Sequence, residues 1–349
     1  MSKSLKIGDL EVKIPVVQGG MGVGISLSGL AGNVSACGGL GVISTAQIGW
    51  REPDFYEKPF EANFRAIEKE IKKARELAKG GVLRVNIMVA TQRYEEYVKS
   101  AVKAGIDIVI SGAGLPIDLP KYVEGSKTKI APIVSSLKSL TVICRMWERK
   151  YQTAPDLVVI EGPKAGGHLG FSREELETVT DEAYDDVIVS IIEKVKEYSE
   201  KFSKKIPVVV AGGIYERKDM EHVMKLGADG VQMGTRFVTT KECDADEAYK
   251  QSYIKAKKED IKIVQSPVGM PGRAILNPFL EKVKTEKCKI KHCYQCIVTC
   301  DKKTIPYCIT EALVNAAEGR VDEGLLFCGE NAYRADKIET VAEIMEEFR

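Results

Sequence analysis

The residues best suited to chemistry lie in a glycine-rich stretch, Glu161–Gly170, which holds one of only three histidines in the chain. The imidazole of His168 can take up or release a proton near neutral pH, as a general base must. The glycines around it let the backbone approach a ligand closely, because they lack a Cβ atom. A tight turn capped by a histidine is the competing interpretation, since a glycine-rich turn is a weak signal by itself.

Short apolar runs and helical patterns alternate along most of the chain, and these elements must position the stretch. The runs predict strands at residues 15–18, 40–44, 83–88, 106–111, 130–134, 157–161, 207–211 and 230–234. Their Val and Ile content is typical of parallel strands covered on both faces. Amphipathic helical patterns lie at residues 27–37, 60–78, 94–104, 136–150, 185–202 and 217–226. Eight strand–helix units in roughly 240 residues predict an α/β fold, a (β/α)8 TIM barrel. The alternative, a doubly wound open sheet, would need no eighth strand.

The apolar runs end in glycine or small polar residues, at the rim where barrels carry their active sites. These ends are Gln18–Met21, Ser44–Thr45, Asn86, Ser111–Gly114, Glu161, Ala211–Gly213 and Gly234–Thr235. The last two follow the seventh and eighth runs, where barrels commonly bind a phosphate through backbone N–H groups. No Walker lysine follows them, which favours a phosphate-bearing cofactor over a nucleoside triphosphate. For any single glycine, a plain tight turn is the simpler interpretation.

Several of these motifs together resemble the nitronate monooxygenase family, formerly 2-nitropropane dioxygenases. The family includes the FMN-dependent enoyl-acyl carrier protein reductase of the second type. The matching segments are residues 18–21, 85–88, 165–170, 210–214 and 231–237. The resemblance implies an FMN-binding barrel in which His168 faces the substrate as the base. It implies that the cofactor is bound by Gly20, Met21, Asn86, Glu161, Gly166, Gly212, Gly213, Gln232, Met233, Gly234 and Thr235.

The resemblance implies an FMN-dependent monooxygenase that oxidises alkyl nitronates with O2. An alternative on the same barrel is an NAD(P)H-dependent reductase of an enoyl thioester or a quinone. Two residues depart from the pattern of many monooxygenase relatives: Lys164 stands where they carry glutamate, and Glu161 where they carry glutamine. Glutamate at the second place also occurs among the enoyl reductases, so the substrate stays open between the two.

A cysteine-rich segment follows the barrel pattern, with five of the nine cysteines at residues 288–308. The spacing of Cys293, Cys296, Cys300 and Cys308 predicts ligands for a [4Fe–4S] cluster or zinc. The same spacing fits one face of a helix, where buried cysteines act as small hydrophobes. A local disulfide is the third possibility. A flavoprotein that senses redox state or metal through this segment is therefore a third functional hypothesis.

We expect the FMN-binding barrel at residues 1–238 and an α-helical substrate or lid subdomain at 239–318. A C-terminal helical segment at 319–349 is expected to pack back on the barrel. The Gly- and Pro-rich residues 266–274 resemble the loop that covers the flavin in this family, although a plain connecting loop fits equally well. Arg273 lies in this segment, and we expect it to form a surface ion pair or to contact an anionic group of the substrate.

The composition excludes several classes of partner. A formal net charge of +1 argues against electrostatic binding to nucleic acid or to a membrane surface. No apolar run reaches the roughly 20 residues that span a bilayer, and the first residues lack the apolar region of a signal peptide. We therefore expect a cytoplasmic enzyme that acts on a small molecule with O2 or NAD(P)H. A homodimer is the commonest assembly for such a chain.

Overall fold

The computed structural model describes residues 4–349, and its centre is a barrel of eight parallel strands. The strands run in the order β3-β11-β10-β8-β7-β6-β5-β4. The two ends of this order meet where the Gln18 N–H donates to the Leu40 carbonyl oxygen at 3.0 Å. Every predicted strand is present, and the barrel prediction is confirmed. The strands are β3 (Val16–Gln18), β4 (Gly41–Ser44), β5 (Leu83–Met88), β6 (Ile108–Gly112), β7 (Lys129–Val134), β8 (Val158–Glu161), β10 (Val208–Ala211) and β11 (Gly230–Met233).

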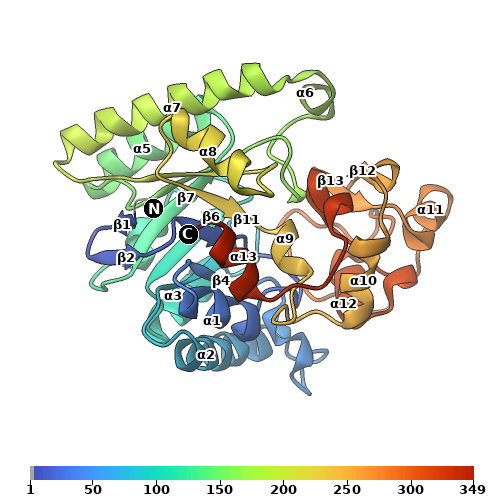
Figure 1. Cartoon of the computed structure of the whole chain (residues 1–349). Coiled ribbons are helices and arrows are strands. Elements are labelled where there is room, and N and C mark those ends of the chain that lie inside the picture. The colour runs from blue at the N-terminus through green and yellow to red at the C-terminus, as the bar shows by residue number, and fades with distance from the viewer. Residues whose placement is uncertain (1–3) are drawn as a thin grey trace.

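Helices surround the barrel, as Figure 1 shows with α2 and α7 on opposite sides of the strands. The longest predicted helices are all present. Helix α7 begins at Asp181 rather than Asp185, because the Thr180 side chain caps it by accepting a hydrogen bond from the Ala183 N–H. These helices are α1 (Ser28–Ala36), α2 (Pro59–Leu77), α3 (Tyr94–Lys103), α4 (Leu119–Tyr122), α5 (Leu137–Tyr151), α6 (Arg173–Thr178), α7 (Asp181–Lys201), α8 (Arg217–Lys225) and α9 (Thr235–Val238).

Two apolar layers stabilise the barrel. One lies between the strands and the surrounding helices, and the other fills the interior of the barrel. The inner layer includes Leu5, Ile7 and Val12 from a short N-terminal hairpin, β1 (Leu5–Ile7) and β2 (Leu10–Val12). Asp9 in its turn pairs with Lys129 at the start of β7, at 2.7 Å. The hairpin therefore closes the amino-terminal end of the barrel. Its three-residue strands are too short to stand out in the sequence.

Residues 247–317 gather at one side of the barrel (Figure 1). They form α10 (Glu247–Lys255), β12 (Ile261–Gln265), β13 (Pro271–Ile275), α11 (Pro278–Thr285) and α12 (Ile309–Ala317). Strands β12 and β13 make an antiparallel hairpin, and β13 also pairs with β9 (Gly167–His168). This part of the chain therefore contains a three-stranded sheet besides its helices. Residues 266–274 form the turn of that hairpin and most of β13 rather than a loop.

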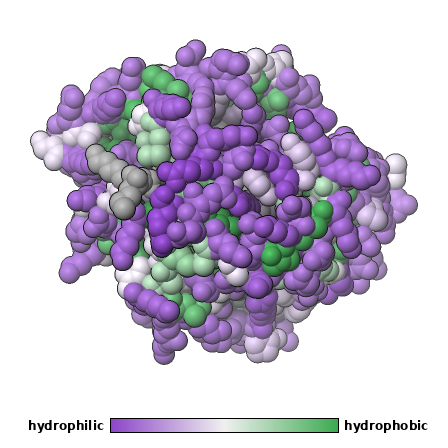
Figure 2. All heavy atoms as spheres, viewed as in Figure 1, coloured by the Kyte–Doolittle hydropathy of each residue, from purple (hydrophilic) through white to green (hydrophobic). Residues whose placement is uncertain are grey.

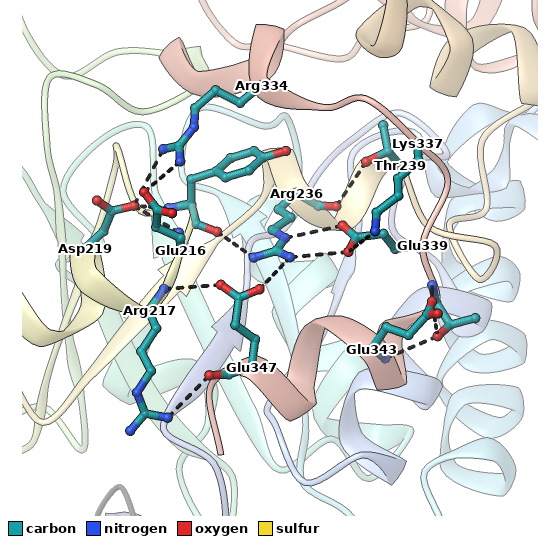
Figure 3. A network of polar contacts seen from close by, with 12 residues as sticks. Glu216, Arg217, Asp219, Arg236, Thr239, Arg334, Lys337, Glu339, Glu343 and Glu347 are labelled. Carbon is teal, nitrogen blue, oxygen red and sulfur yellow. Dashed lines mark hydrogen bonds and ion pairs between the residues drawn. The ribbon is translucent and has the colours of Figure 1, made fainter.

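The last residues return to the barrel through η3 (Val321–Glu323), η4 (Glu330–Arg334) and α13 (Val341–Glu347). Figure 3 shows the polar network that joins them to the barrel. Arg236 of α9 forms ion pairs with Glu339 at 3.3 Å and with Glu347 at 2.7 Å. Helix α13 adds Val341, Ile344 and Met345 to the outer apolar layer.

The face drawn in Figure 2 is mostly hydrophilic, with small separate hydrophobic patches. Among residues 4–349, no helix combines the length and apolar character that a membrane crossing needs.

Candidate functional site

A cavity of about 280 Å³ lies where the barrel strands end and the β12–β13 side of the chain begins. It is lined by His168 and by every residue predicted to bind the cofactor, from Gly20 and Met21 after β3 to Gly234 and Thr235 after β11. The carboxyl ends of neighbouring parallel strands meet at one rim, which is why residues far apart in sequence converge here.

His168 is held between the barrel and the β12–β13 hairpin. Its Nε2 lies 2.8 Å from Oγ of Ser266, and its ring meets the Phe327 ring edge-on at a centroid distance of 4.9 Å. Burial lowers the pKa of His168 to about 4, so the imidazole is neutral at physiological pH. Nδ1 makes no hydrogen bond with residues 4–349. In the tautomer whose Nε2–H donates to the serine, Nδ1 is free to accept a proton as a base must.

Glu161 ends β8 and lines the same cavity. Burial raises the pKa of its carboxyl group to about 7, and no cationic side chain offsets the effect. Its main-chain oxygen accepts a hydrogen bond from the Tyr184 hydroxyl at 3.0 Å, which fixes the backbone. The carboxyl group can therefore donate or accept a hydrogen bond near neutral pH.

Glycine is required at two rims of the cavity because a side chain would clash. A Cβ atom on Gly20 would lie 2.5 Å from Cβ of Asn86. Gly212 has a φ of +96°, and a Cβ there would lie 3.0 Å from the Gly162 carbonyl oxygen. Both positions keep backbone, rather than side chain, against the cavity.

The rim of β10 and β11 is completed by η4. The Asn331 side-chain amide donates to the Gly213 oxygen at 2.7 Å, and the Gly329 N–H donates to Oγ1 of Thr235 at 2.9 Å. Backbone cradles of this kind suit a phosphate, and the polar groups of Asn86 and Glu161 suit the edges of a ring system. The residues present therefore fit FMN.

The wall opposite the strands comes from the expected lid subdomain and the C-terminal segment, in which the sequence singled out no cofactor-binding residue. It is mostly apolar and includes Tyr249, Tyr253, Val268, Ile309, Leu313 and Phe327. The two tyrosine hydroxyls both donate to the main-chain oxygen of Phe327. Their spacing on one helix face was visible in the sequence, but the partner of that face was not.

The prediction for Arg273 is wrong. Arg273 forms no ion pair with residues 4–349, and it does not line the cavity as an anion-binding group. It is buried and donates to the main-chain oxygens of Pro163, at 2.9 Å, and Ala165. Arg273 therefore supports the backbone of the loop that carries His168. Ser266 and Arg273 together fix this loop from the neighbouring hairpin.

The cysteine-rich segment supports only part of one of its three interpretations. Residues 286–308 contain no helix, so the cysteines share no helix face, but Cys288, Cys296 and Cys308 pack against apolar clusters as small hydrophobes. All nine cysteines are free, so the structure contains no disulfide among residues 4–349. Cys293, Cys296, Cys300 and Cys308 line a small cavity of about 30 Å³.

The metal prediction is not supported either. Within the described chain, no group of three or more His, Cys, Asp or Glu side chains is arranged to hold a metal ion. Thiolates must converge tightly on one centre to ligate zinc or a cluster. Without a metal site, the hypothesis of a metal-sensing flavoprotein has no structural support. Besides the small cavity, Cys296 lines the main cavity.

Comparisons with known proteins agree with this geometry. A model of the nitronate monooxygenase family matches residues 3–349. A protein named probable nitronate monooxygenase from Staphylococcus saprophyticus is 26% identical over 299 residues, covering 79% of each chain. One so named from Bacillus subtilis is 26% identical over 292 residues, covering 77% of this chain and 78% of that one.

Solved structures share the fold. FabK from Thermotoga maritima has a TM-score of 0.72 and 27% identity, covering 97% of this chain and 92% of that one. A nitroalkane oxidase from Streptomyces ansochromogenes has a TM-score of 0.71 and 19% identity, covering 96% and 94%. The second likeness concerns the fold alone.

Proposed function

Because this chain belongs to the nitronate monooxygenase family, we propose that it is an FMN-dependent oxidoreductase that oxidises alkyl nitronates with O2. His168 is the proposed base. The observation that carries the proposal is a neutral, half-buried imidazole on the rim of a glycine-lined cavity at the ends of the barrel strands. A neutral nitroalkane must lose its α-proton to become the nitronate, and the imidazole can accept that proton.

The cofactor would be held by the residues that line the strand ends. Gly212, Gly213, Gly234 and Thr235 would surround the phosphate, while Asn86 and Glu161 would bond the polar edges of the ring or the ribityl chain. FMN, when bound, supplies the redox chemistry. The chain supplies position and control of the proton: His168 accepts it at Nδ1, and the wall that contains Phe327 excludes water.

Two measurements test this proposal. The absorbance spectrum of the purified protein should show the two visible bands of oxidised flavin. Addition of an alkyl nitronate should then cause O2 uptake that depends on the protein. A protein that carries flavin but consumes no O2 with any alkyl nitronate would leave the cofactor assignment in place and remove the substrate assignment.

The alternative function is reduction of an enoyl thioester or a quinone by NAD(P)H. Two observations favour it: Glu161 at the end of β8, and the long apolar wall built by Tyr249, Tyr253 and Leu313, which suits an acyl chain. The likeness to FabK agrees with it. Oxidation of NADH that requires an enoyl thioester, with no response to nitronate, would establish this alternative.

A further inference from the structure

An arginine without a counter-ion lies inside the barrel, below the cavity. Arg84 is in β5, where it pairs with Val42 and Ile108 of the neighbouring strands. Both neighbours belong to the apolar layer inside the barrel, so the Arg84 side chain points inward. Asn86, two residues further along the same strand, lines the cavity. Arg84 therefore occupies the layer of side chains directly beneath.

The guanidinium of Arg84 is fully buried and largely without partners. Its Nη2 donates to the main-chain oxygen of Gln18 at 3.2 Å and to Oε1 of Gln232. Its Nε and Nη1 have no hydrogen-bond partner, and none of the ion pairs among residues 4–349 includes it. A buried charge without a partner lowers the stability of a fold. Such a group calls for a functional explanation.

Gln232 connects this charge to the cavity. Arginine is only a donor, so Gln232 must turn its carboxamide oxygen toward Arg84. Its NH2 group makes no hydrogen bond with the described residues and is therefore free to donate to a ligand in the cavity that Gln232 lines. The floor of the cavity thus presents a fixed donor with a positive charge behind it. This pair complements a ligand edge that is rich in acceptors and becomes negative during the reaction.

We propose that Arg84 is a positioning residue for the cofactor, which fixes Gln232 as a donor and favours the reduced, anionic form of the flavin ring. The proposal rests on FMN being the cofactor. A flavin ring that takes up two electrons and one proton carries one negative charge, and nearby positive charge stabilises it. Arg84 itself exchanges no proton or electron.

The test compares FMN affinity, reduction potential and apoprotein stability for Arg84→Met. We expect the FMN dissociation constant to rise by about tenfold or more, since the variant loses an oriented, charge-assisted contact. The potential should become more negative, by about 30 mV for each tenfold loss of preference for the reduced cofactor. The apoprotein should be as stable as wild type or more stable, because an unpaired buried charge is gone.

A positioning role predicts weaker FMN binding with unchanged or higher stability of the apoprotein. A merely structural role of Arg84 would instead lower both FMN affinity and stability. Gln232→Glu provides a second route if Arg84→Met does not fold. It places a carboxylate against Arg84 and neutralises its charge, so the potential should fall in the same way. In Gln232→Leu, a further Arg84→Met change should alter FMN affinity much less than it does in wild type.

Lys250→Met is the matched control, because it removes a buried cation that contacts only the Lys241 carbonyl oxygen, away from the cavity. It should leave affinity and potential unchanged. Unchanged affinity and potential in both Arg84→Met and Gln232→Glu would overturn the inference while leaving FMN in place. A wild-type protein that binds no FMN would instead overturn the proposed function.

Discussion

His168 and Glu161 line one cavity, and burial shifts their pKa values in opposite directions. The pKa of the imidazole falls to about 4, whereas that of the carboxyl group rises to about 7. In both cases burial favours the neutral form. At slightly acidic to neutral pH the site therefore holds an uncharged acceptor and an uncharged donor, the combination that proton transfer requires.

Replacing His168 with Asn should abolish most of the turnover while leaving FMN bound. A positioned base contributes about 10²- to 10⁴-fold, so we expect kcat to fall by that factor. The FMN dissociation constant should change little, because the glycine rims and Asn86 are untouched. The control is His222→Asn, which alters an exposed histidine paired with Asp185. Normal turnover of a neutral nitroalkane by the His168 variant would remove its role as base, because only that substrate must be deprotonated.

Ser266→Ala tests whether the hydroxyl orients the imidazole. Without it, the tautomer that leaves Nδ1 free is no longer favoured, and kcat should fall by roughly 10- to 100-fold with a smaller change in KM. The matched control is Ser252→Ala, whose hydroxyl bonds only the Ala248 oxygen within α10. Equal kcat values for the two variants would contradict the orienting role.

Glu161→Gln should change how the stability of the apoprotein depends on pH. The pKa of about 7 in the folded state lies above the ordinary value of 4.5 for this carboxyl group, so the unfolded chain ionises first as the pH rises. Wild type should therefore lose stability, relative to the variant, between about pH 4.5 and 7, by roughly 1–3 kcal/mol. Urea denaturation across this range measures the effect. Parallel curves for the two proteins would contradict the burial of an ionisable group here.

At the scale of elements, the barrel and the later residues are joined by a half-buried aspartate. Asp244, which follows α9, accepts hydrogen bonds from the N–H groups of Leu27, Gly29 and Leu30, at 2.7 to 3.0 Å. These groups lie at the amino-terminal end of α1 and have no partner within the helix. The carboxylate therefore fixes α1 to the segment that carries α10.

Asp244→Ala should lower the free energy of unfolding by about 1–3 kcal/mol or more, because buried N–H groups would lose their acceptor. Denaturation with urea measures the loss. Asp186→Ala, in the exposed part of α7, serves as the control and should stay within about 0.5 kcal/mol of wild type. Equal effects of the two substitutions would show that Asp244 does not fix α1.

Local patterns predicted the barrel well and the wall opposite its strands poorly. A run rich in Val and Ile marks each strand in the sequence. Rim glycines such as Gly212 and Gly234 follow such runs directly. Tyr249 and Phe327, by contrast, meet only because distant segments pack together. Arg84 interrupts an apolar strand, yet its partner Gln232 is far away in the sequence. The spacing of the cysteines fitted a metal site, but spacing does not determine whether thiols converge.

At the scale of the whole molecule, the site is an assembly of three parts of the chain. The barrel supplies the glycine rims, the β12–β13 hairpin holds His168 through Ser266, and η4 closes the rim of β10 and β11. The returning C-terminal segment is fixed to the barrel by Arg236 and Glu347 (Figure 3). Substrate selection then depends on how these parts meet, which accounts for two candidate reactions on one fold.

Anaerobic stopped-flow mixing tests the central claim most directly, because the flavin absorbance reports which reductant the protein accepts. The enzyme with FMN bound is mixed separately with an alkyl nitronate and with NADH. We predict rapid loss of the oxidised flavin band with nitronate, much slower loss with NADH, and return of the band when O2 is admitted. Rapid bleaching by NADH together with no response to nitronate would contradict the proposed function.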